Sequence, residues 1–111
     1  MAGTVRRGRL RDSSTAPALG EEIERLVALD GIAVEHILSG ELEAPVDYVG
    51  DSDEWVVLLT GLATLVVAGD EVELSAGEWL FLPAGTPHKL VRTAPGSSWL
   101  AVHWRQISPR R

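Results

Sequence analysis

Short apolar runs, separated by glycine, proline and aspartate, are the feature that most restricts how this chain can fold. After a turn expected at Asp30-Gly31, a series of segments rich in valine, isoleucine, leucine or tryptophan extends almost to the end of the chain. These segments are residues 32–38, 55–59, 62–67, 71–74, 79–82, 89–91 and 99–103. Strands of this length, with a turn at roughly every 8–12 residues, are typical of an all-β sandwich or barrel.

The boundaries of the folded part follow from the same pattern. Most of the runs are continuous rather than alternating, which predicts strands covered on both faces, as in a two-layer barrel or a dimer. The segment from Glu21 to Leu29 fits either a short helix, with acids in its first turn, or an extended lead-in to the first strand. Residues 1–19 show little apolar periodicity, so we expect a flexible N-terminal arm, a barrel at 20–104 and a C-terminal tail at 105–111.

Composition narrows the range of partners. The formal charge of −6 disfavours nucleic acid, because phosphate binding depends on clustered lysine and arginine. The chain has no cysteine, so it offers no disulfide, thiolate metal site or cysteine nucleophile. No apolar run is long enough to span a bilayer, and residues 1–10 lack the apolar stretch of a secretory signal. We therefore expect a cytoplasmic protein with no nucleic-acid or membrane partner.

The stretch from Gly77 to Arg92 carries a recognisable spacing. It reads glycine, five residues, Pro83, one residue, Gly85, two residues, His88, three residues and Arg92. Proline stiffens such a loop, and Gly85 can adopt a positive φ angle at little cost. The spacing resembles the second motif of the cupin superfamily, in which asparagine is usual at the position of Arg92.

A second, partial match lies upstream. Glu54 is followed by six residues and Gly61, which resembles the second half of the first cupin motif. The histidine positions of that motif fall on four residues that are not histidine: Asp47, Tyr48, Val49 and Gly50. The resemblance covers about residues 20–104 and implies a double-stranded β-helix, also called a jelly-roll barrel. It also implies, together with the apolar strands, a homodimer.

The resemblance implies that Glu54 and His88 are metal ligands. An imidazole and a carboxylate suit a divalent transition metal such as Zn, Fe, Mn, Ni or Cu. Because two protein ligands alone bind weakly, a third is expected, either Asp51, His103 or one of the nearby residues Asp47, Tyr48 and Asp53. The alternative is that Glu54 and His88 hydrogen-bond each other or a ligand without a metal.

His103 also admits two interpretations. On strand alternation it shares a face with Trp99 and Ala101, which would point it into the barrel. There it is either a ligand or a hydrogen-bonded core residue.

Three residues are candidates for contact with a bound small molecule. Arg92 lies four residues after His88 in the expected strand, an even spacing that puts both on the same face. We therefore expect Arg92 to face the same cavity, where its guanidinium would suit a carboxylate or phosphate. It could instead form a salt bridge with an acid such as Glu54. Tyr48 and Trp79 are the other two candidates, although tryptophans in a chain like this also serve as core or dimer-interface residues.

The leading hypothesis is therefore a small metal-binding cupin that binds a small organic acid in the barrel cavity, with catalysis on that acid left open. The alternative is a non-catalytic cupin that binds or senses a small molecule without a metal. The sequence assigns no catalytic residue.

Overall fold

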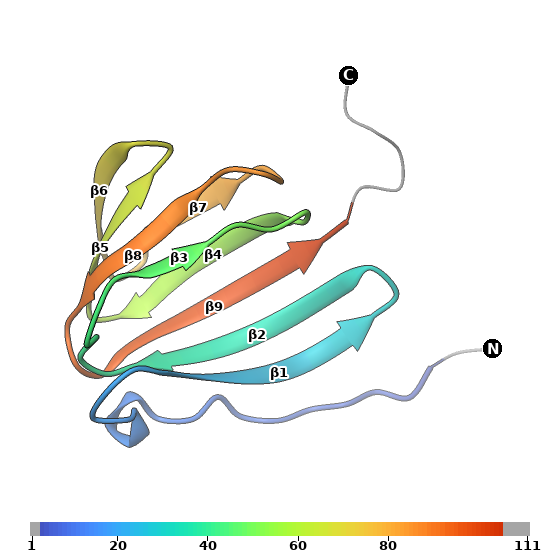
Figure 1. Cartoon of the computed structure of the whole chain (residues 1–111). Helices are drawn as coiled ribbons and strands as arrows, with labels where there is room; N and C mark the ends of the chain where they lie inside the picture. Colours follow the sequence, from blue (N-terminus) through green and yellow to red (C-terminus); the bar gives the residue numbers. More distant parts are fainter. Residues whose placement is uncertain (1–2, 106–111) are drawn as a thin grey trace.

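The computed structural model describes residues 3–105, which form nine β-strands and one turn of 3-10 helix (Figure 1). The elements are η1 (Ser13–Thr15), β1 (Glu21–Leu29), β2 (Ile32–Ser39), β3 (Val46–Tyr48), β4 (Asp53–Thr60), β5 (Leu62–Val67), β6 (Asp70–Ser75), β7 (Trp79–Leu82), β8 (His88–Thr93) and β9 (Ser97–Trp104). Within this described part of the chain, no helix has the length and apolar character needed to cross a membrane.

The strands form two antiparallel sheets that face each other as a jelly-roll barrel, which confirms the predicted fold class (Figure 1). One sheet has the order β1-β2-β9-β4-β7 and the other the order β3-β8-β5-β6. Side chains from the inner faces of both sheets interdigitate to form the core, as in other two-layer β structures. Its buried members are Val56, Leu58, Ala63, Leu65, Leu74, Leu82, Leu90, Trp99 and Ala101.

The sequence left open whether Glu21–Leu29 forms a helix or an extended segment, and in the structure it is a β-strand. It is β1, paired antiparallel with β2 from Glu21 opposite Ser39 to Leu29 opposite Ile32, with one irregularity in register. The intervening turn uses Gly31 at a positive φ of 79°, which a glycine adopts without strain. Pairing with β2 along the length of the segment outweighs its weak local preference for a helix.

The segment before β1 is held to the barrel at its C-terminal end. Leu19 forms an isolated bridge with Glu41, the Gly20 amide donates to the Glu41 carbonyl at 2.8 Å, and Glu41 donates to Ala18 at 3.0 Å. Residues 3–12 are exposed. The flexibility expected for residues 1–19 stays a prediction, and of the expected tail at 105–111 only Arg105 lies within the described residues.

Candidate functional site

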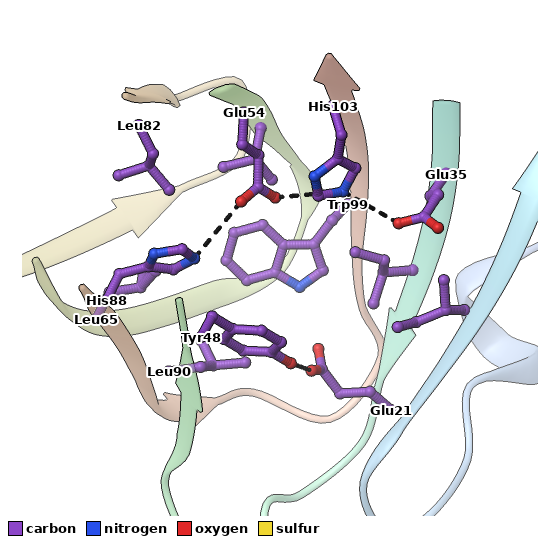
Figure 2. A pocket seen from close by; sticks show the side chains of 13 residues that line it. Glu21, Glu35, Tyr48, Glu54, Leu65, Leu82, His88, Leu90, Trp99 and His103 are labelled. Atoms are coloured by element: carbon purple, nitrogen blue, oxygen red, sulfur yellow. Dashed lines mark hydrogen bonds and ion pairs between the residues drawn. The ribbon is translucent and has the colours of Figure 1, made fainter. Parts of the chain in front are cut away.

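A small cavity of about 110 Å³ lies between the two sheets and contains most of the predicted site residues (Figure 2). Its apolar walls come from Ile23, Ile37, Val56, Leu65, Leu82, Leu90 and Trp99. Its polar lining consists of Glu21, Glu35, Tyr48, Glu54, His88 and His103. A largely apolar pocket with a few convergent polar groups is the usual form of a small-molecule site.

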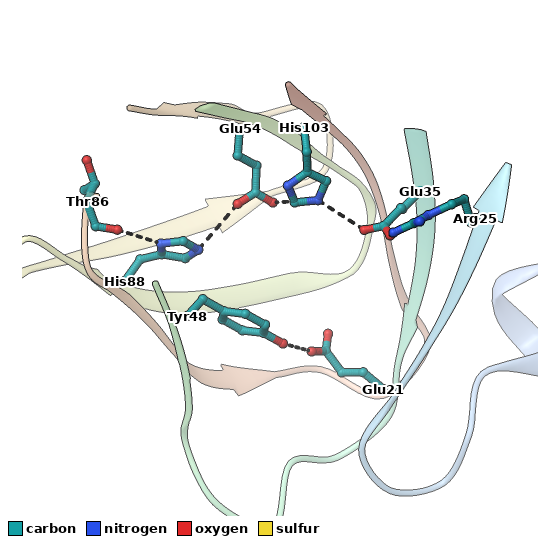
Figure 3. Close-up of polar contacts among 8 residues, drawn as sticks. All are labelled: Glu21, Arg25, Glu35, Tyr48, Glu54, Thr86, His88 and His103. Carbon is teal, nitrogen blue, oxygen red and sulfur yellow. Dashed lines mark hydrogen bonds and ion pairs between the residues drawn. The ribbon is translucent and has the colours of Figure 1, made fainter. Parts of the chain in front are cut away.

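Glu54 is the central polar group of this cavity. It lies near the start of β4, opposite His103 of β9 and Leu82 of β7, and alternation along β4 turns it inward with Val56. Its Oε1 is 3.5 Å from His88 Nε2, and its Oε2 is 3.7 Å from His103 Nε2. Glu54 therefore lies between the two imidazoles, each facing a different carboxylate oxygen (Figure 3).

His88 begins β8 and is held on three sides. Its Nδ1 is 3.1 Å from the Thr86 carbonyl, so Nδ1–H donates there and Nε2 faces Glu54. Its ring stacks on Tyr48, with ring centroids 5.5 Å apart and planes 16° from parallel. The hydrogen bond with Glu54 raises the pKa of His88, against the opposing effect of partial burial. The environment thus stabilises the protonated imidazole next to a carboxylate.

His103 points into the cavity, as strand alternation predicts, and it joins a residue that the sequence interpretation missed. Its Nε2 is 3.1 Å from Glu35 Oε1, and Glu35 Oε2 accepts a hydrogen bond from Arg25 at 3.0 Å. A line of polar groups thus extends from Glu54 through His103 and Glu35 to Arg25 at the surface (Figure 3). The available signal was a lone acid within the otherwise apolar strand β2, on the opposite face from the buried His36.

Glu21 is the second polar residue that sequence reasoning did not assign to the site. Its carboxylate accepts hydrogen bonds from Tyr48 Oη and Ser39 Oγ, both at 2.6 Å, and Ser39 Oγ in turn accepts from Trp99 Nε1 at 3.1 Å. Burial raises the pKa of Tyr48, and the hydrogen bond to Glu21 adds to that effect. The Tyr48–Glu21 bond links β3 and β1, which are edge strands of the two different sheets (Figure 2).

The other acids proposed as a third metal ligand have separate roles. Asp53 is buried and accepts the Ala84 amide at 2.9 Å, which holds the loop before His88. Asp47 is exposed and lies 3.8 Å from Lys89 Nζ. Asp51 forms an exposed ion pair with Arg105. It lies at the mouth of the barrel, where it shares a second hollow, of about 270 Å³, with residues of the cavity.

The expectation that Arg92 faces the same cavity as His88 is wrong. On β8, Leu90 pairs with Leu65 of β5, but Arg92 pairs with Thr64, the neighbour of Leu65. Val91 has no partner on β5 and is therefore an extra residue, a β-bulge, in β8. Such a bulge reverses the alternation of side chains beyond it. Arg92 is therefore exposed on the outside of the four-stranded sheet, in a shallow groove with Glu73.

Trp79 also lies outside the cavity. Its side chain is on the outer face of β7, is 59% exposed, and has its ring centroid 6.3 Å from that of Trp55. Phe81 and Trp104 form a second stacked pair on this face, at 6.0 Å. Of the four tryptophans, Trp99 alone lines the cavity.

The donor atoms present match a transition metal by type but not by arrangement. Two imidazoles and a carboxylate are suitable donors. A single ion needs its ligands about 2.0–2.2 Å away and converging on one point. Among residues 3–105, no three histidine, aspartate or glutamate side chains converge in this way. As placed, Glu54 contacts His88 and His103 at N···O distances of 3.5 and 3.7 Å, which are ion-pair distances and not metal–ligand distances.

Comparison with known proteins agrees with this architecture. A protein from Ralstonia eutropha JMP134, described as a proposed mannose-6-phosphate isomerase, is 28% identical, with a TM-score of 0.76 over 89% of this chain and 100% of that one. A cupin protein from Bacteroides fragilis is 20% identical, with a TM-score of 0.67 over 100% of this chain and 92% of that one. KdgF from Halomonas sp. is 17% identical, with a TM-score of 0.66 over 83% of this chain and 81% of that one.

The last two similarities show the fold alone. No curated protein matches the chain. The family model described as "Cupin domain" matches residues 33–103, which include β3 to β8 and all but one residue of each of β2 and β9. The chain belongs to the cupin family.

Proposed function

We propose that this cupin binds a small polar organic molecule in the barrel cavity, through Glu54, His88 and His103, without a bound metal. The observation that carries this proposal is the row of hydrogen-bonding groups along one side of an otherwise apolar cavity. In small-molecule sites of this kind, contact with the apolar walls provides most of the affinity. A few polar groups at fixed positions orient the ligand and make binding specific.

The charges of the side chains that line the cavity indicate which kind of ligand group can bind next to Glu54. Three carboxylates line the cavity, those of Glu21, Glu35 and Glu54, and within the described part of the chain the only basic side chains there are His88 and His103. An anion beside these groups would be repelled, whereas a hydroxyl or amine would donate a hydrogen bond to a carboxylate. The part of the ligand inside the cavity is therefore a hydroxyl-bearing or amine-bearing group. The similar Ralstonia protein is named for a hydroxyl-rich substrate, a sugar phosphate, which agrees with this chemistry.

A second candidate is the metal-dependent form of the same function, with Glu54 and His88 as ligands and His103 as the third. It is favoured by one observation, the hydrogen bond of His88 Nδ1 to Thr86, because ligating histidines commonly donate their other ring nitrogen to a carbonyl. A divalent ion at Glu54 would also allow the cavity to take the carboxylate of an organic acid. Metal-bound and metal-free forms thus predict different ligands.

The Glu54→Gln variant separates the two candidates. A panel of monosaccharides, polyols, amines and hydroxy acids is screened by thermal shift, and hits are measured by calorimetry with and without a chelator. We expect a hydroxyl or amine compound to bind, with its affinity unchanged by the chelator and at least about tenfold weaker in the variant, because the acceptor is then a neutral amide instead of a carboxylate.

The matched control is Glu73→Gln, which makes the same charge change on the exposed outer sheet and should bind like the parent protein. Elemental mass spectrometry is run on all three proteins. Near-stoichiometric metal that is lost only with Glu54→Gln, together with binding abolished by the chelator, contradicts the metal-free proposal and supports the second candidate.

We also propose that the protein is a homodimer that covers the outer aromatic face of the five-stranded sheet. Trp79 and Phe81 are 59% and 43% exposed there, beside Trp55 and Trp104. Exposed aromatic clusters of this kind are enriched at protein interfaces. Sedimentation equilibrium measures the mass directly, and a monomer at micromolar concentration contradicts the proposal.

A further inference from the structure

We propose that the mouth of the barrel contains a separate anion-binding subsite, formed by Arg25, Arg105 and His103, that takes a carboxylate or phosphate group. These residues line a hollow of about 390 Å³ next to the cavity. The remainder of its lining consists of Ala28, Leu29, Gly31, Ile32, Ala33, Glu35 and Ser52. This subsite goes beyond the proposed function, because it concerns a different set of side chains and a different ligand charge.

Three parts of the chain converge at this end of the barrel. The β1–β2 turn, the end of β9 and the loop before β4 lie together there (Figure 1). The Arg105 amide donates to the Gly31 carbonyl at 3.0 Å, which continues the pairing of β9 with β2 by one residue. This bond places the Arg105 backbone beside the hairpin that carries Arg25 on β1. Ser52 approaches from the loop and adds a hydroxyl donor.

Both arginines retain donors for a ligand. Arg25 donates from Nη2 to Glu35 Oε2 at 3.0 Å, and Arg105 donates from Nη2 to Asp51. A guanidinium has five N–H donors in a planar fork that suits carboxylate and phosphate oxygens. The two side chains are 61% and 66% exposed, so their ion pairs are weak and a multivalent anion competes with them effectively.

The charge of the hollow contrasts with the rest of the protein. The chain has a formal charge of −6, and the adjacent cavity is lined by three glutamates and, among residues 3–105, by no lysine or arginine. Among the described residues, the hollow is lined by two arginines, one histidine and one acid, Glu35, and Asp51 pairs with Arg105 beside it. Two guanidinium groups here and none in the cavity favour the hollow over the cavity for an anionic group.

The hollow and the cavity adjoin at His103 and Glu35, which line both. A ligand that reaches past this pair would place a hydroxyl or amine near Glu54 and an anionic group beside the two arginines. Arg92, which the sequence suggested for the anionic group, is excluded from this arrangement by the bulge in β8. The structure assigns that role to Arg25 and Arg105 instead.

The test uses inorganic phosphate and malonate as probes, titrated into the full chain at low ionic strength and followed by calorimetry and amide chemical shifts. Arg25→Gln and Arg105→Gln are made singly and together. We expect saturable binding to the parent protein, with shifts at residues 31–33, 52 and 103–105, and at least a tenfold weaker Kd in the double variant. Binding of both probes indicates the shared anion chemistry, and binding of one alone identifies the group.

Arg92→Gln is the matched control, because it removes one exposed arginine far from the hollow and should change Kd by less than twofold. The assay also separates this subsite from the cavity function, because it follows phosphate and malonate, whereas the cavity is tested with hydroxyl and amine compounds. The proposal is overturned if the double variant binds like the parent protein. It is also overturned if Arg92→Gln weakens binding as much as either single variant, since the effect would then be one of net charge.

Discussion

Replacing Gly61 with alanine is expected to lower the free energy of unfolding by about 4 kcal/mol, by adding backbone strain of about 1–3 kcal/mol to overpacking of about 1–3 kcal/mol. Gly61 connects β4 to β5 with a φ of 95°, a value that residues with a side chain rarely adopt. For a domain of this size the change corresponds to a fall in Tm of roughly 15 °C.

Overpacking contributes because the added methyl group has no space. A Cβ on Gly61 would lie 2.1 Å from Ser97 Oγ and 2.8 Å from Ser97 Cα. Ser97 is fully buried, and its Oγ donates to the Ala94 carbonyl at 2.6 Å. Moving Ser97 away would therefore break a buried hydrogen bond or shift the start of β9.

Gly85→Ala is the control that isolates the backbone contribution. Gly85 has a similar φ of 80°, but a Cβ there would meet open space. We expect a loss of only about 1–2 kcal/mol, the cost of the left-handed conformation alone. Chemical denaturation measures the free energy of unfolding of both variants. An equal decrease in the two would show that the close approach of the added methyl group to Ser97 does not destabilise the protein.

Leu58→Ala is expected to cost about 2–5 kcal/mol, the range for deleting a leucine side chain from a packed core. Leu58 is 0% exposed and lies on the inner face of β4, opposite Trp99 of β9. Removing its isobutyl group leaves a void that a close-packed barrel interior fills only in part. Guanidinium denaturation should show a lower midpoint with an unchanged slope.

Leu62→Ala is the matched control, because Leu62 is 59% exposed at the start of β5. The same substitution there should cost less than about 1 kcal/mol. A loss for Leu58→Ala as small as for Leu62→Ala would contradict the position of the core between the two sheets.

Much of the fold could be predicted from the sequence, because turn residues and apolar runs mark strands in a local way. Each expected segment from Ile32 to His103 corresponds to a strand, and the spacing from Gly77 to His88 correctly placed a β-turn-β unit. The segment from Glu21 to Leu29 could not be decided locally, since it becomes a strand only by pairing with β2.

The site was less predictable, for two physical reasons. Counting residues along a strand predicts which sheet face a side chain is on only where the strand is regular. The extra residue Val91 interrupts β8, so Arg92 is on the outer face and not the inner one. Alternation also loses its meaning where both faces are covered. His36 and Glu35 are adjacent on β2 and both are shielded from solvent, so alternation alone did not show which of the two faces the cavity.

Alternation along β4 has an evolutionary consequence. Glu54 points into the cavity, and Trp55, the next residue, points to the outer face of the same sheet. The layer of backbone between them keeps the two environments apart, so a substitution on one face has little direct effect on the other. Ligand preference and surface chemistry can thus diverge independently among related proteins, even though neighbouring codons of one strand encode the residues that determine them.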